Sequence, residues 1–135
     1  MSDLETTESG VRAKIESWAR VVSDGNRAGI LAYHADDLLR FYFPTTVRGL
    51  DAYDKIWDFF FPNPRGPIRF EPRKMTVTAD KELAFVSCEI HCDGTSAGPI
   101  DFRLTTGLRK IDGEWAIVHE HHSVPTDHAR LIGPQ

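Results

Sequence analysis

The apolar positions near the start of the chain recur every three or four residues, a spacing typical of an amphipathic helix. Five of them form one stripe: Val11, Ile15, Trp18, Ala19 and Val22. Gly25 follows the stripe at the place where a glycine commonly ends a helix. Asn26 can then cap a short second helix, which we expect to run to Tyr33. The chain is therefore predicted to open with two helices.

A third helix is predicted from Leu50 to about Phe60. Its apolar and aromatic positions share one side: Leu50, Tyr53, Ile56, Trp57 and Phe60. Before it, the run "LLRFYF" at residues 38–43 reads as a short strand that Pro44 stops. After it, "PNPRGP" at residues 62–67 contains three prolines and a glycine, so a loop is expected there.

From residue 68 onward the hydrophobic period changes from helical to alternating. Four segments read as strands: 68–79, 82–93, 100–111 and 114–124. The pair Asp112-Gly113 between the last two predicts a two-residue hairpin. Helices followed by a four-stranded antiparallel meander describe an α+β fold. We expect one domain at 11–125, a flexible N-terminus at 1–10 and a C-terminal tail at 126–135.

The composition is that of a single soluble globular domain, with 135 residues, 41% hydrophobic and 27% charged. The net charge of −4 is spread along the chain, which argues against nucleic-acid binding. The polar start does not resemble a signal peptide, and no apolar run is long enough to cross a membrane. Cys88 and Cys92, four residues apart on a strand, lie too far apart to bridge, and a cytoplasmic location is expected.

Three stretches carry a resemblance: "AYHADD" at 32–37, "FP" with "RGLDAYDKIW" at 43–57, and "RKIDGEWAIVHEHHSVP" at 109–125. From Val11 to Pro125 the sequence resembles the nuclear transport factor 2-like superfamily. This superfamily holds ketosteroid isomerases, SnoaL-type polyketide cyclases and scytalone dehydratases. The resemblance implies a cone-shaped, strongly curved antiparallel sheet wrapped round three N-terminal helices. It also implies an apolar pocket at the open end and a homodimer joined through the outer sheet face.

The resemblance also tests one activity. Ketosteroid isomerases use a tyrosine, an aspartate base and a protonated aspartate. The corresponding positions here hold Trp18, Tyr42 and Thr106, and neighbouring tyrosine positions hold His34 and Trp57. None of the three working groups is present. We therefore predict that the protein is not a steroid isomerase by the known mechanism.

The motif "HEHH" at residues 119–122 is divided by strand alternation. Glu120 and His122 share one face. The resemblance implies that this face points into the cone, together with the row Phe102, Leu104, Thr106 and Leu108. A carboxylate beside an imidazole raises the pKa of the imidazole and fixes its tautomer, as a general base requires. The alternative is a buried ion pair or hydrogen-bonded pair without chemistry.

The opposite face of the last strand is expected to hold Trp115, Ile117, His119, His121 and Ser123. The His-x-His spacing occurs in metal sites, with His91, Asp127 and His128 as further candidate ligands. An interface or surface position is the stronger interpretation, and we predict no metal or other cofactor. Trp115 and Ile117 would form an apolar patch on this face, which predicts a homodimer that weakens below about pH 6.

Two function classes remain open. The first is an enzyme that transfers a proton on an apolar or aromatic small molecule, in an isomerisation, dehydration or cyclisation. His122 would be the base and Glu120 would orient it. The substrate would contact residues of the helices and inner sheet face: Trp18, His34, Tyr42, Trp57, Phe60 and Thr106. The second class is a non-catalytic ligand-binding or assembly domain whose pocket holds a carboxylate or other metabolite. Asp36 and Asp37 are expected at the end of the second helix, at the cavity rim or in solvent.

Overall fold

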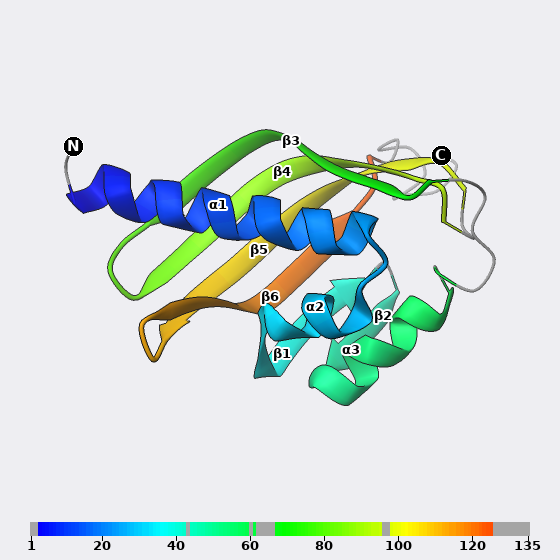
Figure 1. Ribbon diagram of the computed structural model, residues 1–135, viewed down its shortest axis with the longest axis horizontal. Helices are drawn as coiled ribbons and strands as arrows, with labels where there is room; N and C mark the ends of the chain where they lie inside the picture. The colour runs from blue at the N-terminus through cyan, green and yellow to red at the C-terminus, as the bar shows by residue number, and fades with distance from the viewer. Residues whose placement is uncertain (1–2, 43, 60, 62–66, 96–97, 126–135) are drawn as a thin grey trace, which may run out of the picture.

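Within the residues that the computed structural model describes (3–42, 44–59, 61, 67–95 and 98–125), three α-helices lie inside a curved six-stranded sheet (Figure 1). The helices are α1 (Asp3–Ser23), α2 (Arg27–Ala32) and α3 (Leu50–Ile56), and a 3₁₀ turn, η1 (Trp57–Phe59), continues α3. The strands are β1 (His34–Tyr42), β2 (Thr45–Arg48), β3 (Arg69–Ala79), β4 (Leu83–Asp93), β5 (Ile100–Ile111) and β6 (Glu114–Ser123). The predicted α+β cone is confirmed.

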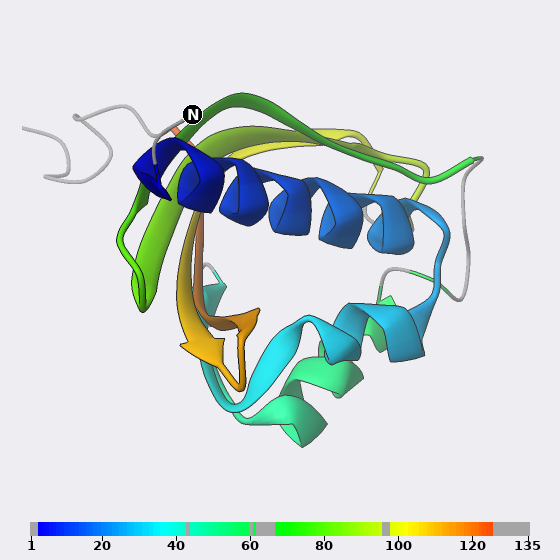
Figure 2. The same ribbon diagram turned by 60° about the vertical axis from the view of Figure 1, so that its left-hand side comes forward.

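Helix α1 packs its predicted apolar stripe against the sheet. The five stripe residues from Val11 to Val22 are all buried. Figure 2 shows α1 under the arch of β3, β4 and β5, with α2 and α3 along the other side of the cone. The helix begins at Asp3, within the segment predicted as a flexible N-terminus. Gly25 ends it with a positive φ of 69°, and Asn26 caps α2 by accepting a hydrogen bond from the backbone N–H of Gly29.

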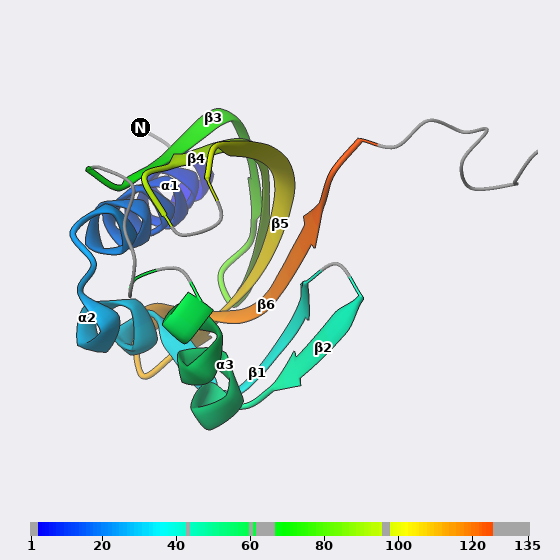
Figure 3. The ribbon, with the colours of Figure 1, turned by 90° about the vertical axis from the view of Figure 1, so that its right-hand side faces the viewer.

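The sheet order is β2-β1-β6-β5-β4-β3, and β1 pairs in parallel with β6. The sheet is therefore mixed, where the sequence predicted a wholly antiparallel one. Figure 3 shows it curling round the helices. Parallel neighbours need a long connection, and here α3 and β3–β5 lie between the two strands in sequence. The short edge strand β2 was not predicted.

Strand β1 begins at His34, directly after the end of α2. Asp36 and Asp37 are exposed and lie within this strand, so the prediction that they end the second helix is wrong. Asp37 instead pairs with Arg109 of β5, with 3.4 Å between the carboxylate oxygen and Nη2. Its exposed position makes this a weak surface ion pair.

A β-bulge interrupts the alternation of β6. Leu108 of β5 pairs with Ile117, whereas the preceding Gly107 pairs with His119, so that Val118 is an extra residue in β6. A Cβ atom on Gly107 would lie 3.3 Å from the Cβ of His119, which is closer than most Cβ contacts in proteins. Glycine at this position therefore lets the two strands approach at the bulge.

Because of the bulge, buried side chains before and after Val118 point to the same inner face of the sheet. Trp115 and Ile117 are 8% and 0% exposed, and Glu120 and His122 are buried as well. The prediction that Trp115 and Ile117 share the outer face with the histidines is wrong, because the extra residue reverses the alternation between Ile117 and Glu120. The apolar patch proposed as a dimer contact is thus part of the core.

The core fills the space between α1 and the inner sheet face. The predicted β5 row is buried: Phe102, Leu104, Thr106 and Leu108. Cys88 and Cys92 are free and buried, and burial raises the pKa of both thiols to about 11. No helix in the described part of the chain is long and apolar enough to span a membrane.

Candidate functional site

Three neighbouring strands bring polar residues together at the centre of the inner face. Arg40 of β1 lies opposite Glu120 of β6, which lies opposite Thr106 of β5. Two residues further along, Tyr42 of β1 lies opposite His122 of β6. All of these except the half-buried Tyr42 are buried. The sheet register therefore assembles a polar cluster inside an otherwise apolar cone.

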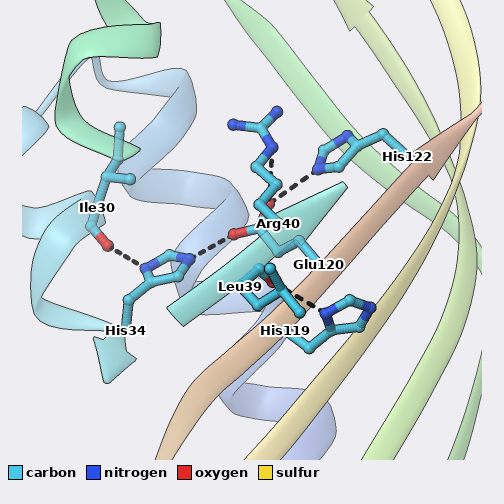
Figure 4. Close-up of polar contacts among 7 residues, drawn as sticks. All are labelled: Ile30, His34, Leu39, Arg40, His119, Glu120 and His122. Carbon is cyan, nitrogen blue, oxygen red and sulfur yellow. Dashed lines mark hydrogen bonds and ion pairs between the residues drawn. The ribbon is translucent and has the colours of Figure 1, made fainter. Parts of the chain in front are cut away.

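Glu120 is the centre of this cluster. It is fully buried, and its Oε2 lies 2.5 Å from Nε2 of His34 (Figure 4). Its Oε1 lies 2.8 Å from Nε2 of His122. His34 in turn donates from Nδ1 to the backbone carbonyl of Ile30 in α2, at 2.8 Å. A chain of hydrogen bonds thus runs from the end of α2 through Glu120 to His122.

The hydrogen bonds restrict where protons can sit. The carbonyl of Ile30 only accepts, so Nδ1 of His34 carries a proton. The short contact between Nε2 of His34 and Glu120 then holds one shared proton. That proton belongs either to a histidinium facing a carboxylate or to a carboxylic acid facing a neutral imidazole. In both cases the His34–Glu120 pair is neutral overall.

The surroundings of Glu120 favour its carboxylate form despite its burial. Burial raises the pKa of its carboxyl, but the hydrogen bonds from His122 and His34 and the positive charges of His34 and Arg40 lower the pKa well below its ordinary value. A carboxylate only accepts, so Nε2 of His122 donates to it. Nδ1 of His122 therefore carries a lone pair. This atom is buried and has no hydrogen-bond partner among the described residues.

His122 is a neutral imidazole at pH 7. Burial, followed by the charge of Arg40, lowers its pKa to about 4, and the carboxylate of Glu120 opposes this shift only in part. The expectation that Glu120 raises the pKa of His122 above its ordinary value is therefore wrong. Desolvation of the imidazolium outweighs the attraction of a single neighbouring carboxylate.

Arg40 is a site residue that the sequence analysis did not single out. Its side chain is 2% exposed, and its Nε lies 3.7 Å from Oε1 of Glu120, too far for a hydrogen bond. Neither Nε nor Nη1 has a hydrogen-bond partner in the part of the chain that the structure describes. Three aromatic rings surround the guanidinium carbon, Tyr42 at 4.5 Å, Tyr53 at 5.4 Å and Trp57 at 5.8 Å.

A small cavity of about 40 Å³ opens beside the cluster. Its polar wall is formed by Arg40, His122 and Thr95. The rest of its lining is apolar or aromatic and includes Tyr42 and Trp57. An apolar cavity with a few convergent polar groups is the usual composition of a small-molecule site.

Comparison with known proteins identifies the family. The SnoaL-like domain family matches residues 11–127. This chain belongs to that family. Among solved structures, the chain is similar to an NTF2-like protein of unknown function from Pseudomonas putida KT2440, with 32% identity, a TM-score of 0.80, and coverage of 91% of this chain and 89% of the other. No match was found among curated proteins.

Two more distant structures share the fold of this SnoaL-like domain. One is a candidate scytalone dehydratase from Novosphingobium aromaticivorans DSM 12444, with 14% identity and a TM-score of 0.78, covering 87% of this chain and 83% of the other. The other is a candidate ketosteroid isomerase from Shewanella frigidimarina NCIMB 400, with 20% identity and a TM-score of 0.68, covering 82% and 92%. At these identities the likeness concerns the fold.

The residues predicted to contact substrate divide into three groups. Tyr42 and Trp57 line the cavity of the SnoaL-like domain, together with His122. Trp18, His34 and Thr106 are buried but do not line it. Trp18 instead packs edge-on against His34, with 5.9 Å between the ring centroids. Phe60 lies outside the described residues.

The other two histidines of "HEHH" face outward, so the prediction that Glu120 and His122 point inward while His119 and His121 point outward is confirmed. Nδ1 of His119 donates to the backbone carbonyl of Leu39 at 2.9 Å. Among the described residues, no group of three His, Cys, Asp or Glu side chains could hold a metal ion. His91 contacts Asp101 instead, and the other candidate ligands, Asp127 and His128, lie outside the described residues.

Proposed function

We propose that this SnoaL-like domain is an enzyme that transfers a proton on an apolar or aromatic small molecule, with Nδ1 of His122 as the base. One observation carries the proposal. The Nδ1 lone pair of a cavity-lining histidine has no protein partner among the described residues, while Nε2 of the same ring is held by Glu120. A base that is oriented from one side and unoccupied on the other is the arrangement that general base catalysis requires.

The proposed step begins at a carbon next to an electron-withdrawing carbonyl. Nδ1 of His122 removes a proton from that carbon, and the C–H electron pair becomes an enolate. The imidazolium then returns the proton to another carbon in an isomerisation, or to a leaving hydroxyl that departs as water in a dehydration. Glu120 stabilises the imidazolium through its hydrogen bond to Nε2, and His34 positions Glu120.

The comparisons support this class of reaction at the level of the fold, since the similar structures include isomerase and dehydratase candidates. The mechanism of the ketosteroid isomerases is not proposed, because Trp18, Tyr42 and Thr106 stand where those enzymes carry their working groups. The reaction is instead assigned to the Glu120–His122 pair.

Exchange of carbon-bound protons in D₂O tests the proposal. Proton NMR would follow 2-tetralone and phenylpyruvate at neutral pH with the wild-type protein and with His122→Gln. We expect the wild-type protein to accelerate exchange of at least one ketone and His122→Gln to lose about 100-fold or more of this rate. Glutamine keeps a donor to Glu120 but offers no basic nitrogen. The control is His121→Gln on the outer face. Exchange that is equally fast in His122→Gln contradicts the assignment.

A binding role without chemistry is the second candidate, and one observation favours it. Burial and the charge of Arg40 lower the pKa of His122 to about 4, which makes it a weak base in the empty pocket. A ligand-binding domain would use the same cavity without needing a strong base. Ligand binding without any exchange of carbon-bound protons would select this alternative.

A further inference from the structure

We propose that the ligand of this pocket carries a carboxylate group and that the guanidinium of Arg40 binds it. The proposal names the class of ligand for the pocket described above. It rests on that pocket being a small-molecule site, and it does not require that His122 transfers a proton. Its test is therefore a binding experiment.

The polar cluster inside the cone carries a positive charge. The His34–Glu120 pair shares one proton and is neutral overall, and His122 is neutral at pH 7. Arg40 is cationic, so the buried cluster carries a net charge of +1. The structure describes no ion pair of Arg40 other than the long one to Glu120. A buried charge without full compensation is unfavourable, and an anionic ligand would remove that penalty.

Arg40 has hydrogen-bond donors that no described residue uses. Glu120 accepts hydrogen bonds from both histidines, but its Oε1 lies 3.7 Å from Nε of Arg40, too far for a hydrogen bond, so this carboxylate does not satisfy the Arg40 donors. Nη1 and Nε of Arg40 are buried without hydrogen-bond partners among the described residues. Oγ1 of Thr95, in the same cavity wall, is also buried without a partner among these residues. A guanidinium presents its N–H groups in the plane of the group, where a carboxylate accepts two of them in parallel.

The surroundings of the guanidinium indicate the chemistry of the rest of the ligand. The aromatic rings of Tyr42, Tyr53 and Trp57 surround the guanidinium, and the cavity beyond it is apolar and small. Such a site excludes water from the charge and accepts an apolar body. The apolar lining therefore favours a small monocarboxylate over a phosphate or a sugar, which would need many more polar partners.

Calorimetric titration of the intact protein with benzoate and with its neutral analogue benzamide tests the proposal, with propionate as a smaller carboxylate. We expect benzoate or propionate to bind and benzamide to bind at least roughly 30-fold more weakly. The variant Arg40→Met should lose binding by a similar factor, and Arg40→Lys should retain part of it because the charge remains. The control Arg109→Met removes an exposed arginine of the outer face and should bind like the wild type.

Thermal unfolding separates a binding role of Arg40 from a structural one. If the charge is kept for a ligand, Arg40→Met without ligand unfolds at the wild-type temperature or above, because an uncompensated buried charge has been removed. Equal binding of benzamide and benzoate overturns the proposal, and so does undiminished binding to Arg40→Met. No binding of either carboxylate at millimolar concentration overturns it too. Exchange catalysis that persists in that case leaves the proposed proton transfer standing.

Discussion

Acidification should destabilise the protein through the neutral, buried imidazole of His122. In the unfolded chain a histidine has a pKa of about 6.5, whereas burial and Arg40 lower the pKa of His122 in the folded protein to about 4. Between these values the unfolded chain binds a proton that the folded protein does not. The stability contributed by neutral His122 is therefore fully present above about pH 6.5 and is lost as the pH falls toward about 4.

The magnitude follows from the two pKa values. Between pH 7.5 and pH 5.0, a histidine with an unfolded pKa of about 6.5 and a folded pKa of about 4 reduces the free energy of unfolding by about 2 kcal/mol. Glu120 acts in the same direction, because its folded pKa is lowered, but its contribution is lost only below the unfolded pKa of a glutamate, about 4.3. The chosen pH range thus separates the contribution of His122 from that of Glu120.

Urea unfolding at pH 7.5 and pH 5.0 measures this loss through the fluorescence of the buried tryptophans. The variant His122→Gln removes the titrating ring but keeps a donor to Glu120, so its free energy of unfolding should fall by about 2 kcal/mol less than that of the wild type over this range. The control His121→Gln removes an exposed imidazole from the outer face and should keep the wild-type loss. If His122→Gln and the wild type lose the same stability, His122 does not titrate as the burial of its ring requires.

Three further predictions concern the fold and assembly. Trp115→Ala should lower the free energy of unfolding by about 3–5 kcal/mol, since Trp115 belongs to the core, and a loss below about 1 kcal/mol in urea unfolding would contradict this. Gly107→Val should lower it by about 1–3 kcal/mol because of the close approach of His119, whereas Gly10→Ala on the exposed side of α1 should raise it by about 1 kcal/mol. We still expect a homodimer through the outer sheet face, now with the exposed Phe41 in the contact. Sedimentation at pH 8 should give a dimer for the wild type and a monomer for Phe41→Asp, and a wild-type monomer at micromolar concentration refutes the expectation.

Local patterns predicted most of the elements of this fold. The stripe from Val11 to Val22 fixed the buried side of α1, because the side chains of a helix that lie three or four positions apart share one face. The alternating segments became β3 to β6 with nearly the predicted bounds, and Asp112-Gly113 forms the hairpin turn with positive φ at both residues. In each case the signal and the structure lie within a few neighbouring residues.

The sequence also contains two indications about the site and its strands that the prediction did not use. Arg40 alternates with the apolar Leu38 and the aromatic Tyr42, which indicates that it points to the same inner face. Gly107 inside a strand pattern is a common sign of a bulge. The prediction that Trp115 and Ile117 face outward assumed unbroken alternation along β6. The bulge at Val118 interrupts that alternation.

The sequence by itself determined most of the helices and strands and that Glu120 and His122 are two residues apart on one face. Only the tertiary structure decided what surrounds them. The parallel pairing of β1 with β6 sets Arg40 and His34, both residues of β1, beside Glu120. These groups come from distant parts of the chain, and no local period encodes the register between them. The balance of burial, carboxylate and guanidinium that sets the pKa of His122 exists only once that register has formed.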